Sequence, residues 1–450
     1  MRTPRVIIAG VSSGSGKTTA VCAILSLLKQ NNADVRACKC GPDYIDPMFH
    51  RKVTGVPCAG LDPFFCDGDL LKYLLCKNAG GRVTVIEGVM GYYDGTGKTG
   101  TDNSTFTVAG KTDSPVILVV DGKGSSSSIL AVTEGFLKFT DDSRIKGVLL
   151  NRVSKMNYEN VRRLMADRFG DKIVPVGYIP ELPEDCRIPS RHLGLVTADE
   201  ITDLSRRIGR TAALCRETID INALLSVADT APELMFKAPN IKRYGKIKLA
   251  VAYDNAFCFY YGDTLDMFRE MGADIEFFSP LDDMPVPDGS DGLIIGGGYP
   301  ELYADRLESN TKAKESVKKA VLSGMPVIAE CGGFQYLGKE LDGKEMCNVL
   351  GHSSYDTGGL VRFGYVTLTS KKDGLFGAAG TELKAHEFHY LDSTDNGNGF
   401  TAKKPNGKEW ECAVYTDTLY AGYPHLFLMS NISAAESFYK KCLEYKENKR

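Results

Sequence analysis

A cysteine at the end of an apolar run stands in a setting where a side chain often does chemistry. Residues 325–331 read MPVIAEC, and small residues stand two positions before and two after Cys331, at Ala329 and Gly333. This spacing is typical of a nucleophile elbow, a tight strand-to-helix turn that exposes the nucleophile. We expect the helix that follows to direct its positive N-terminal end at the sulfur and to lower the pKa of the thiol. The alternative is a structural cysteine that packs as a small apolar side chain.

Two further segments could complete an acyl-transfer site. Residues 291–298 read as a buried strand that runs into three glycines. The backbone N–H groups of Gly297, Gly298 and Gly332 could stabilise an oxyanion. Downstream, His425 could act as the base that takes the thiol proton. Together these features resemble a class I glutamine amidotransferase, which cleaves L-glutamine through a cysteine and releases ammonia.

A glycine-rich loop near the N-terminus predicts a phosphate-binding site. Residues 10–19 read GVSSGSGKTT, after a strand-like run and before an apolar-periodic stretch, which is the context that a P-loop requires. Five residues separate Gly10 from Gly16, one more than in the usual P-loop. This spacing resembles the dethiobiotin synthetase group, whose members activate carboxylates by phosphorylation. We expect Lys17 to neutralise phosphate charge. The residues expected to bind the nucleotide are Gly14, Gly16, Lys17, Thr18 and Thr19.

Acidic residues at strand ends predict a magnesium site beside this loop. Residues 83–87 read as a buried strand that ends at Glu87, and ligands gather at the carboxyl ends of parallel strands. Mg²⁺ prefers oxygen ligands. The expected metal ligands are Thr18, Asp43 and Glu87. Asp46 and Asp94 lie further along glycine-flanked loops, and we expect them to contact the substrate. The alternatives are a solvated or capping role for Glu87 and turn formation by the aspartates.

Two phrases of the N-terminal half, combined with the extended P-loop, resemble one family. They are KCGPDYIDPMFH at residues 39–50 and EGVMGYYDG at residues 87–95. The combination resembles the cobyrinic acid a,c-diamide synthase family, which amidates the a and c carboxylates of cobyrinic acid in making corrinoid cofactors. The resemblance covers nearly the whole chain. It implies that ATP, with Mg²⁺, converts the carboxylate to an acyl phosphate, and that ammonia released at Cys331 then displaces phosphate.

Sister amidases on the same scaffold share these motifs. They act on hydrogenobyrinic acid or nickel-sirohydrochlorin, or make cobyric acid, and the shared motifs do not choose among these substrates. An alternative of another class is a P-loop regulatory ATPase fused to a degenerate amidotransferase domain. The intact pair of Cys331 and His425 argues against this alternative.

The histidine motif departs from the standard class I pattern. Standard class I amidotransferases have a glutamate two residues after this histidine, which orients the imidazole, and here that position is Phe427. The departure is expected of the cobyrinate/cobyrate type. Glu387, in the phrase AHEFHY, is the candidate for the orienting partner because this phrase also resembles the family. His386 and His389 of the same phrase are expected to serve in capping or core hydrogen bonds.

The elements that must position these residues form two α/β rhythms. We predict a P-loop, dethiobiotin-synthetase-like parallel-sheet domain over residues 1–235 and a class I glutamine amidotransferase (flavodoxin-like) α/β domain over residues 246–440. A Pro-containing stretch without periodicity places a linker at residues 236–245. Helix-like sequence over residues 198–226 precedes it. The strand-end pair Asn151–Arg152 is placed near the base of ATP, as in other P-loop nucleotide enzymes.

The composition is that of an ordinary globular enzyme. A net charge of −3 gives no reason to expect nucleic acid or an anionic membrane as a partner. The chain has no run of about 18 apolar residues and no signal-peptide pattern. Its 13 scattered cysteines lack disulfide or metal spacing, which fits a reducing cytoplasm. The family resemblance implies cobyrinic acid, glutamine and ATP as partners, whereas the charge gives no reason to expect nucleic acid or membrane, and a homodimer is left open.

Overall fold

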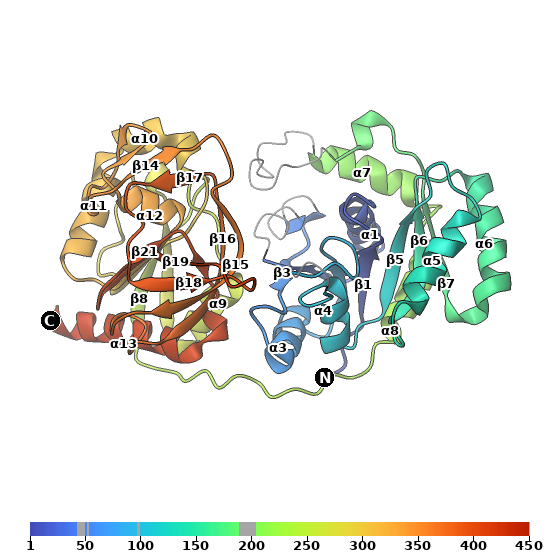
Figure 1. The fold of residues 1–450 in the computed structure, drawn as a ribbon, viewed down its shortest axis with the longest axis horizontal. Coiled ribbons are helices and arrows are strands. Elements are labelled where there is room, and N and C mark those ends of the chain that lie inside the picture. The colour runs from blue at the N-terminus through green and yellow to red at the C-terminus, as the bar shows by residue number, and fades with distance from the viewer. Residues whose placement is uncertain (43–49, 52–53, 97–99, 189–203, 450) are drawn as a thin grey trace. The chain divides into compact units, whose positions relative to one another are not determined.

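The computed structural model describes the chain except for residues 43–49, 52–53, 97–99, 189–203 and 450. It divides into two compact units, Met1–Pro239 and Asn240–Arg450 (Figure 1). Residues 231–246 form neither helix nor strand. The second unit ends with a helix that runs to Asn448, past the boundary expected at residue 440. No helix among the described residues is long and apolar enough to cross a membrane.

The first unit is built on one parallel sheet. Among the described residues its strand order is β3-β2-β4-β1-β5-β6-β7, and every pairing is parallel. Its strands are β1 (Arg5–Gly10), β2 (Val35–Cys40), β3 (Cys58–Leu61), β4 (Val83–Glu87), β5 (Val116–Asp121), β6 (Ile145–Asn151) and β7 (Val174–Ile179). Successive residues Val6, Ile7 and Ile8 are all fully buried. The sheet is therefore covered on both faces, which explains why its strands read as continuous apolar runs.

Helices of the first unit follow the strands in the expected alternation. They are α1 (Lys17–Gln30), α3 (Gly68–Ala79), α4 (Thr105–Lys111), α5 (Ser128–Lys138), α6 (Lys155–Phe169), α7 (Leu204–Cys215) and α8 (Ile221–Asp229). Residues of α1, α7 and α8 share one hydrophobic core with the central strands. The helix-like sequence before the linker is thus two helices, α7 and α8, in its described part. Asp220 separates them because its side chain accepts the Ala223 N–H as the N-cap of α8.

The second unit combines a mostly parallel sheet with two smaller sheets. The larger sheet has the order β20-β21-β11-β10-β8-β9 in the described chain, and only β20 is antiparallel to its neighbour. Its strands are β8 (Ile247–Ala252), β9 (Ala273–Phe278), β10 (Gly292–Ile295), β11 (Val327–Glu330), β20 (Val414–Tyr415) and β21 (Leu419–Gly422). The helices are α9 (Gly262–Met271), α10 (Ala304–Ser309), α11 (Thr311–Leu322), α12 (Gly332–Leu337) and α13 (Ile432–Asn448). The parallel α/β architecture predicted for this half is confirmed.

The two smaller sheets are features that the sequence did not reveal. In the described residues one has the order β13-β12-β14-β17, and the other, fully antiparallel, has the order β19-β18-β15-β16-β22. Their strands are β12 (Glu340–Leu341), β13 (Lys344–Glu345), β14 (Ser353–Asp356), β15 (Arg362–Ser370), β16 (Glu382–His389), β17 (Leu391–Ser393), β18 (Phe400–Lys403), β19 (Glu409–Cys412) and β22 (His425–Leu426). Many of these strands are too short to produce a readable period.

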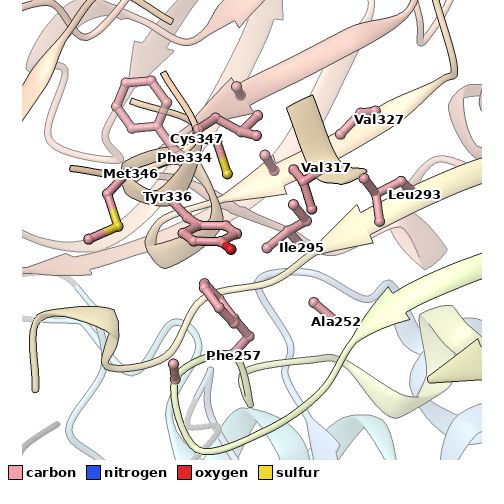
Figure 2. Close-up of a cluster of buried hydrophobic side chains, with 14 of the residues drawn as sticks. Ala252, Phe257, Leu293, Ile295, Val317, Val327, Phe334, Tyr336, Met346 and Cys347 are labelled. Atoms are coloured by element: carbon pink, nitrogen blue, oxygen red, sulfur yellow. The ribbon is translucent and has the colours of Figure 1, made fainter. Parts of the chain in front are cut away.

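Cys331 belongs to the hydrophobic core of the second unit. Every residue of the helix that follows this cysteine, α12, is buried. Figure 2 shows Phe334 and Tyr336 of this helix among Phe257, Ile295 and other core side chains. The rings of Phe257 and Tyr336 lie 5.2 Å apart, centroid to centroid. Because α12 is buried along its whole length, its packing holds the preceding turn at Cys331 in place.

Candidate active sites

The turn at Cys331 has the backbone geometry of a nucleophile elbow. Cys331 follows β11 directly, precedes α12, and has φ 48° and ψ −102°. A non-glycine residue in this region costs about 1–3 kcal/mol, so the surrounding structure must enforce it. The Cys331 N–H donates to the Gly422 carbonyl at 2.8 Å. A methyl group at Gly333 would lie 2.2 Å from the Ile295 carbonyl oxygen, so only glycine fits there.

The predicted depression of the thiol pKa is wrong for this structure. Burial raises the pKa of the Cys331 thiol well above its ordinary value, and the Glu301 carboxylate adds to this effect. The Gly332 N–H points at the sulfur and acts in the opposite direction, as expected of a helix start, but it is outweighed. The sequence pattern contains the helix but not the degree of burial, which is why the prediction failed. The thiol is thus neutral at rest and must lose its proton to a base.

Glycines of the predicted oxyanion loop lie against both the base and the nucleophile. A methyl group at Gly297 would lie 2.2 Å from His425 Cε1. A methyl group at Gly332 would lie 3.3 Å from the backbone nitrogen of Gly298. The structure therefore gathers the three predicted oxyanion glycines, Cys331 and His425 at one place, although Gly297 and His425 are 128 positions apart in the sequence.

A carboxylate that the sequence analysis passed over lies beside His425. Glu330 Oε2 is 3.8 Å from His425 Nδ1, and Glu330 Oε1 accepts the Leu426 N–H at 2.9 Å. Burial raises the pKa of Glu330 to about 8 and lowers that of His425 to about 3. In the strand pairing His386 stands opposite His425, so the next residue, Glu387, points to the other face of β16. The register thus disfavours the predicted orienting partner Glu387.

The glycine-rich loop of the first unit has the local geometry of a phosphate-binding loop. Gly14 and Gly16 have φ values of 77° and 94°, which side-chain-bearing residues rarely adopt. Lys17 Nζ donates to the Ser12 carbonyl at 3.1 Å and to the Met90 carbonyl, so its ammonium group lies at the loop. The start of α1 follows at once, and the N–H groups of a helix N-terminus suit an anion.

Asn151 supports this loop from the neighbouring strand. Its Nδ2 group donates to the Ser15 carbonyl at 2.9 Å, and a methyl group at Gly16 would lie 2.2 Å from the same nitrogen. Arg152 instead pairs with Asp121 near the surface. The described contacts of Asn151 are therefore with the phosphate-binding part of the loop, and they give it a positioning role that the sequence did not indicate.

The predicted metal ligand Glu87 lies at the centre of a buried polar cluster. Thr18 Oγ1 donates to Glu87 Oε1 at 2.6 Å, and Lys39 Nζ donates to the same oxygen at 3.1 Å. His50 Nε2 lies 2.5 Å from Glu87 Oε2, and His50 Nδ1 lies 3.7 Å from Cys22 Sγ. The strand register places Lys39 beside Glu87. Neither Lys39 nor His50 was predicted from the sequence to have a role at this site.

The charged groups of this cluster shift one another's pKa values. Burial alone would raise the pKa of Glu87, but Lys39 and His50 outweigh it and hold the carboxyl pKa well below its usual range. Burial alone would lower the pKa of His50, but Cys22 and Glu87 raise it to about 10. The cluster therefore holds one carboxylate between two cations, a net positive charge that suits an anionic ligand.

The donor atoms fit Mg²⁺ in part. Thr18 Oγ1 and Glu87 Oε1 are adjacent oxygen atoms, the kind of donor that this cation prefers. Lys39 and His50, however, contact the same carboxylate. The described part of the chain has no group of three or more His, Cys, Asp or Glu side chains placed to hold a metal. The third predicted ligand, Asp43, lies outside the described residues.

The predicted substrate residues can be placed only in part. Asp94 is exposed, and its Oδ2 accepts the Gly91 N–H at 2.9 Å, which closes the turn after β4. Asp46 lies outside the described residues. Among the other predicted nucleotide-binding residues, Thr19 lies in the first turn of α1 beside Thr18.

Comparison with known proteins supports this division into two kinds of site. Residues 6–196 match the model of the CobQ/CobB/MinD/ParA nucleotide binding domain, and residues 248–432 match that of the CobB/CobQ-like glutamine amidotransferase domain. The chain is thus a P-loop nucleotide-binding domain followed by a glutamine amidotransferase domain.

Full-length relatives define the family more closely. A protein of Listeria monocytogenes is 38% identical over 442 residues, covering 95% of this chain and 97% of its own. One of Thermoplasma volcanium is 36% identical over 462 residues, covering 100% and 99%, and one of Streptococcus sanguinis is 40% identical over 390 residues, covering 85% and 86%. All three are named cobyrinate a,c-diamide synthase. The chain belongs to this family and is a glutamine-dependent amidating ligase.

Proposed function

We propose that this chain uses ATP and glutamine to amidate the a and c carboxylates of cobyrinic acid. The observation that carries the proposal is the convergence of Cys331, on a strained elbow, with His425 and a glycine loop, in a chain whose other unit holds a P-loop. The names of the full-length relatives support the corrinoid substrate.

In the second unit Cys331 attacks the side-chain amide carbon of glutamine. His425 takes the thiol proton as the C–S bond forms, and the N–H groups of Gly298 and Gly332 stabilise the oxyanion of the tetrahedral intermediate. His425 then gives its proton to the leaving nitrogen, so ammonia departs and a thioester remains. Water, activated by the same imidazole, hydrolyses the thioester to glutamate and restores the thiol.

In the first unit a substrate carboxylate attacks the γ-phosphoryl group of ATP. An acyl phosphate and ADP form, and ammonia then displaces phosphate to give the amide and release a proton. Lys17 neutralises charge on the transferring group, and Asn151 keeps the loop in shape. Thr18 and Glu87, with Asp43, would hold Mg²⁺, which when bound neutralises phosphate charge. The net positive cluster of Lys39, His50 and Glu87 favours approach of an anionic substrate.

The experiment that tests this function is a substrate panel. The purified protein is incubated with ATP, Mg²⁺, glutamine and one acid in each reaction. The three acids are cobyrinic acid, hydrogenobyrinic acid and nickel-sirohydrochlorin, and products are identified by mass spectrometry. We expect cobyrinic acid to gain two amide groups, with 1 mol of ADP and of glutamate per amide. Faster diamidation of another acid would assign the chain to a sister activity. Glutamine hydrolysis without amidation of any of the three acids would contradict the proposal.

A further inference from the structure

Glu330 occupies the place from which a carboxylate could control His425. Glu330 is the last residue of β11 and directly precedes the nucleophile, and His425 is the first residue of β22. Its two oxygens have separate neighbours: Oε1 accepts the Leu426 N–H at 2.9 Å, and Oε2 lies 3.8 Å from His425 Nδ1. The hydrogen bond to the backbone of the residue next to the histidine fixes the carboxyl group relative to the imidazole.

Other candidates for this role are less well placed. The position two after the histidine is Phe427, whose ring packs edge-on against Tyr261 at 5.0 Å between centroids. Glu387 lies on the face of β16 opposite to the residue that pairs with His425. Glu330 Oε2, in contrast, lies 3.8 Å from His425 Nδ1.

We propose that Glu330 is the positioning residue of His425, accepting a hydrogen bond from Nδ1–H and so holding the imidazole in the tautomer whose Nε2 can take the Cys331 proton. The inference deepens the proposed function and rests on it. A distance of 3.8 Å is longer than a hydrogen bond, and such contacts commonly tighten when substrate binds.

The proposal makes a specific demand on protonation. Nδ1 must carry the hydrogen, because a base whose Nε2 is already protonated cannot accept the thiol proton. An ionised Glu330 accepts from Nδ1–H and favours the productive tautomer. A protonated Glu330 would donate to Nδ1 and favour the unproductive one. When His425 takes the thiol proton, the carboxylate also offsets the positive charge that appears on the imidazole.

The surroundings of Glu330 favour its titration near neutral pH. The nine described residues that line the small pocket beside it, Glu330 included, contain no lysine or arginine. The titratable groups that face it are His425 on β22, Tyr260 and Tyr261 before α9, Tyr420 on β21, and Cys331. Burial of the tyrosines and the thiol raises the pKa of Tyr260, Tyr420 and Cys331 well above neutrality. Glu330, whose pKa burial raises to about 8, therefore changes charge between pH 6 and 9.

Two variants separate positioning from a purely structural role. Glu330→Gln keeps an oxygen to accept the Leu426 N–H, but its amide would donate to Nδ1 and select the wrong tautomer. Glu330→Met fills a similar volume and removes both functions. We expect Glu330→Gln to lower kcat for glutamine hydrolysis about 100-fold, at least as much as Glu330→Met, with KM for glutamine changed less than threefold. Ammonia-dependent amidation should stay at the parental rate in both.

The pH profile supplies a second readout. For the parent, kcat/KM for glutamine should rise with pH as Glu330 ionises, with a midpoint near its pKa of about 8. This rise should be absent in Glu330→Gln. Burial raises the pKa of Glu301 and of Glu387 to about 7, so each could titrate in the same window. The rise should therefore persist in Glu301→Gln and in Glu387→Gln.

A matched control lies at the other end of the same sheet. Asp291 is also buried and accepts a backbone N–H, from Lys248 at 2.9 Å, before β10. Asp291→Asn should leave glutamine hydrolysis unchanged. A folded Glu330→Gln protein with parental kcat and pH profile would overturn the proposal and reduce Glu330 to a backbone acceptor. If the parent itself hydrolyses no glutamine while it uses ammonia, the proposed roles of Cys331 and His425 fail, and this inference fails with them.

Discussion

In the first unit Glu87 is buried between Lys39 and His50, whereas in the second unit Glu330 is buried beside a neutral imidazole in a pocket without lysine or arginine. The first carboxyl has a pKa far below its usual range, and burial raises the pKa of the second to about 8. The first centre therefore holds permanent charge, as phosphate chemistry requires. The second holds a neutral thiol and a neutral imidazole beside a carboxyl group whose charge changes with pH near neutrality.

This contrast has a physical basis in the two reactions. A nucleotide and a carboxylate substrate arrive with several negative charges, so a preorganised cationic cluster lowers the cost of taking them out of water. Glutamine presents an uncharged amide to the thiol. A neutral thiol–imidazole pair avoids burying a charge before the substrate binds, and the oxyanion glycines stabilise charge where it develops.

The largest expected effect concerns Cys331. Cys331→Ala should abolish glutamine-dependent synthesis, by more than about 10³-fold, because the thioester cannot form. Ammonia-dependent synthesis should continue, since in the proposed mechanism the first unit makes the acyl phosphate without the thiol. Rates with saturating glutamine and with ammonium salts, compared at one pH, check this. Loss of both activities in a folded variant would show that the two centres are not chemically separate.

The next effect tests the charged centre. Lys17→Ala should lower synthesis from either nitrogen source about 100-fold, because phosphate neutralisation precedes both. Hydrolysis of glutamine by the second unit should retain a measurable rate. Synthesis from ammonia at the parental rate would remove the P-loop from the mechanism.

A smaller effect compares buried with exposed charge. His50→Gln should lower the free energy of unfolding by about 3 kcal/mol, because it removes one partner of a buried ion pair. The matched change Lys138→Gln breaks the surface pair with Glu134, where the lysine side chain is 76% exposed, and should leave the free energy of unfolding unchanged within error. Urea unfolding, followed by far-ultraviolet circular dichroism, measures the free energy of unfolding of both variants. Equal stabilities would mean that the cluster around Glu87 is not a held ion pair.

The smallest expected effect concerns the order of products. We expect Asp94→Asn, and likewise Asp46→Asn, to slow the second amidation more than the first by severalfold, so that a monoamide accumulates. The physical reason is that the monoamide, which is the substrate of the second amidation, carries one negative charge fewer than the diacid. A nearby aspartate therefore interacts differently with the two. Asn at position 94 can still accept the Gly91 N–H, so the turn should survive. ATP binding should be nearly unchanged. A time course with the parental ratio of mono- to diamide would refute this role.

Local motifs made much of the protein predictable from sequence. The nucleophile elbow and the P-loop are each contiguous motifs. Gly14 and Gly16 have left-handed φ values, and Gly333 has no room for a methyl group. The strand-end position of Glu87 also followed from a buried run. These signals are readable because each motif is a short contiguous stretch with its small residues at fixed spacing. The two α/β rhythms similarly come from local apolar periodicity.

Tertiary structure alone decided the partners and the electrostatics. Lys39 and His50 meet Glu87 because β2 pairs with β4 and because His50 packs under α1, and nothing local to either residue indicates this. Glu330 meets His425, 95 positions away, only through the fold. The pKa of Cys331 depends on burial by distant segments, so the helix behind it predicted the wrong direction. Desolvation and pairing depend on which surfaces come together, and that is settled by packing rather than by sequence spacing.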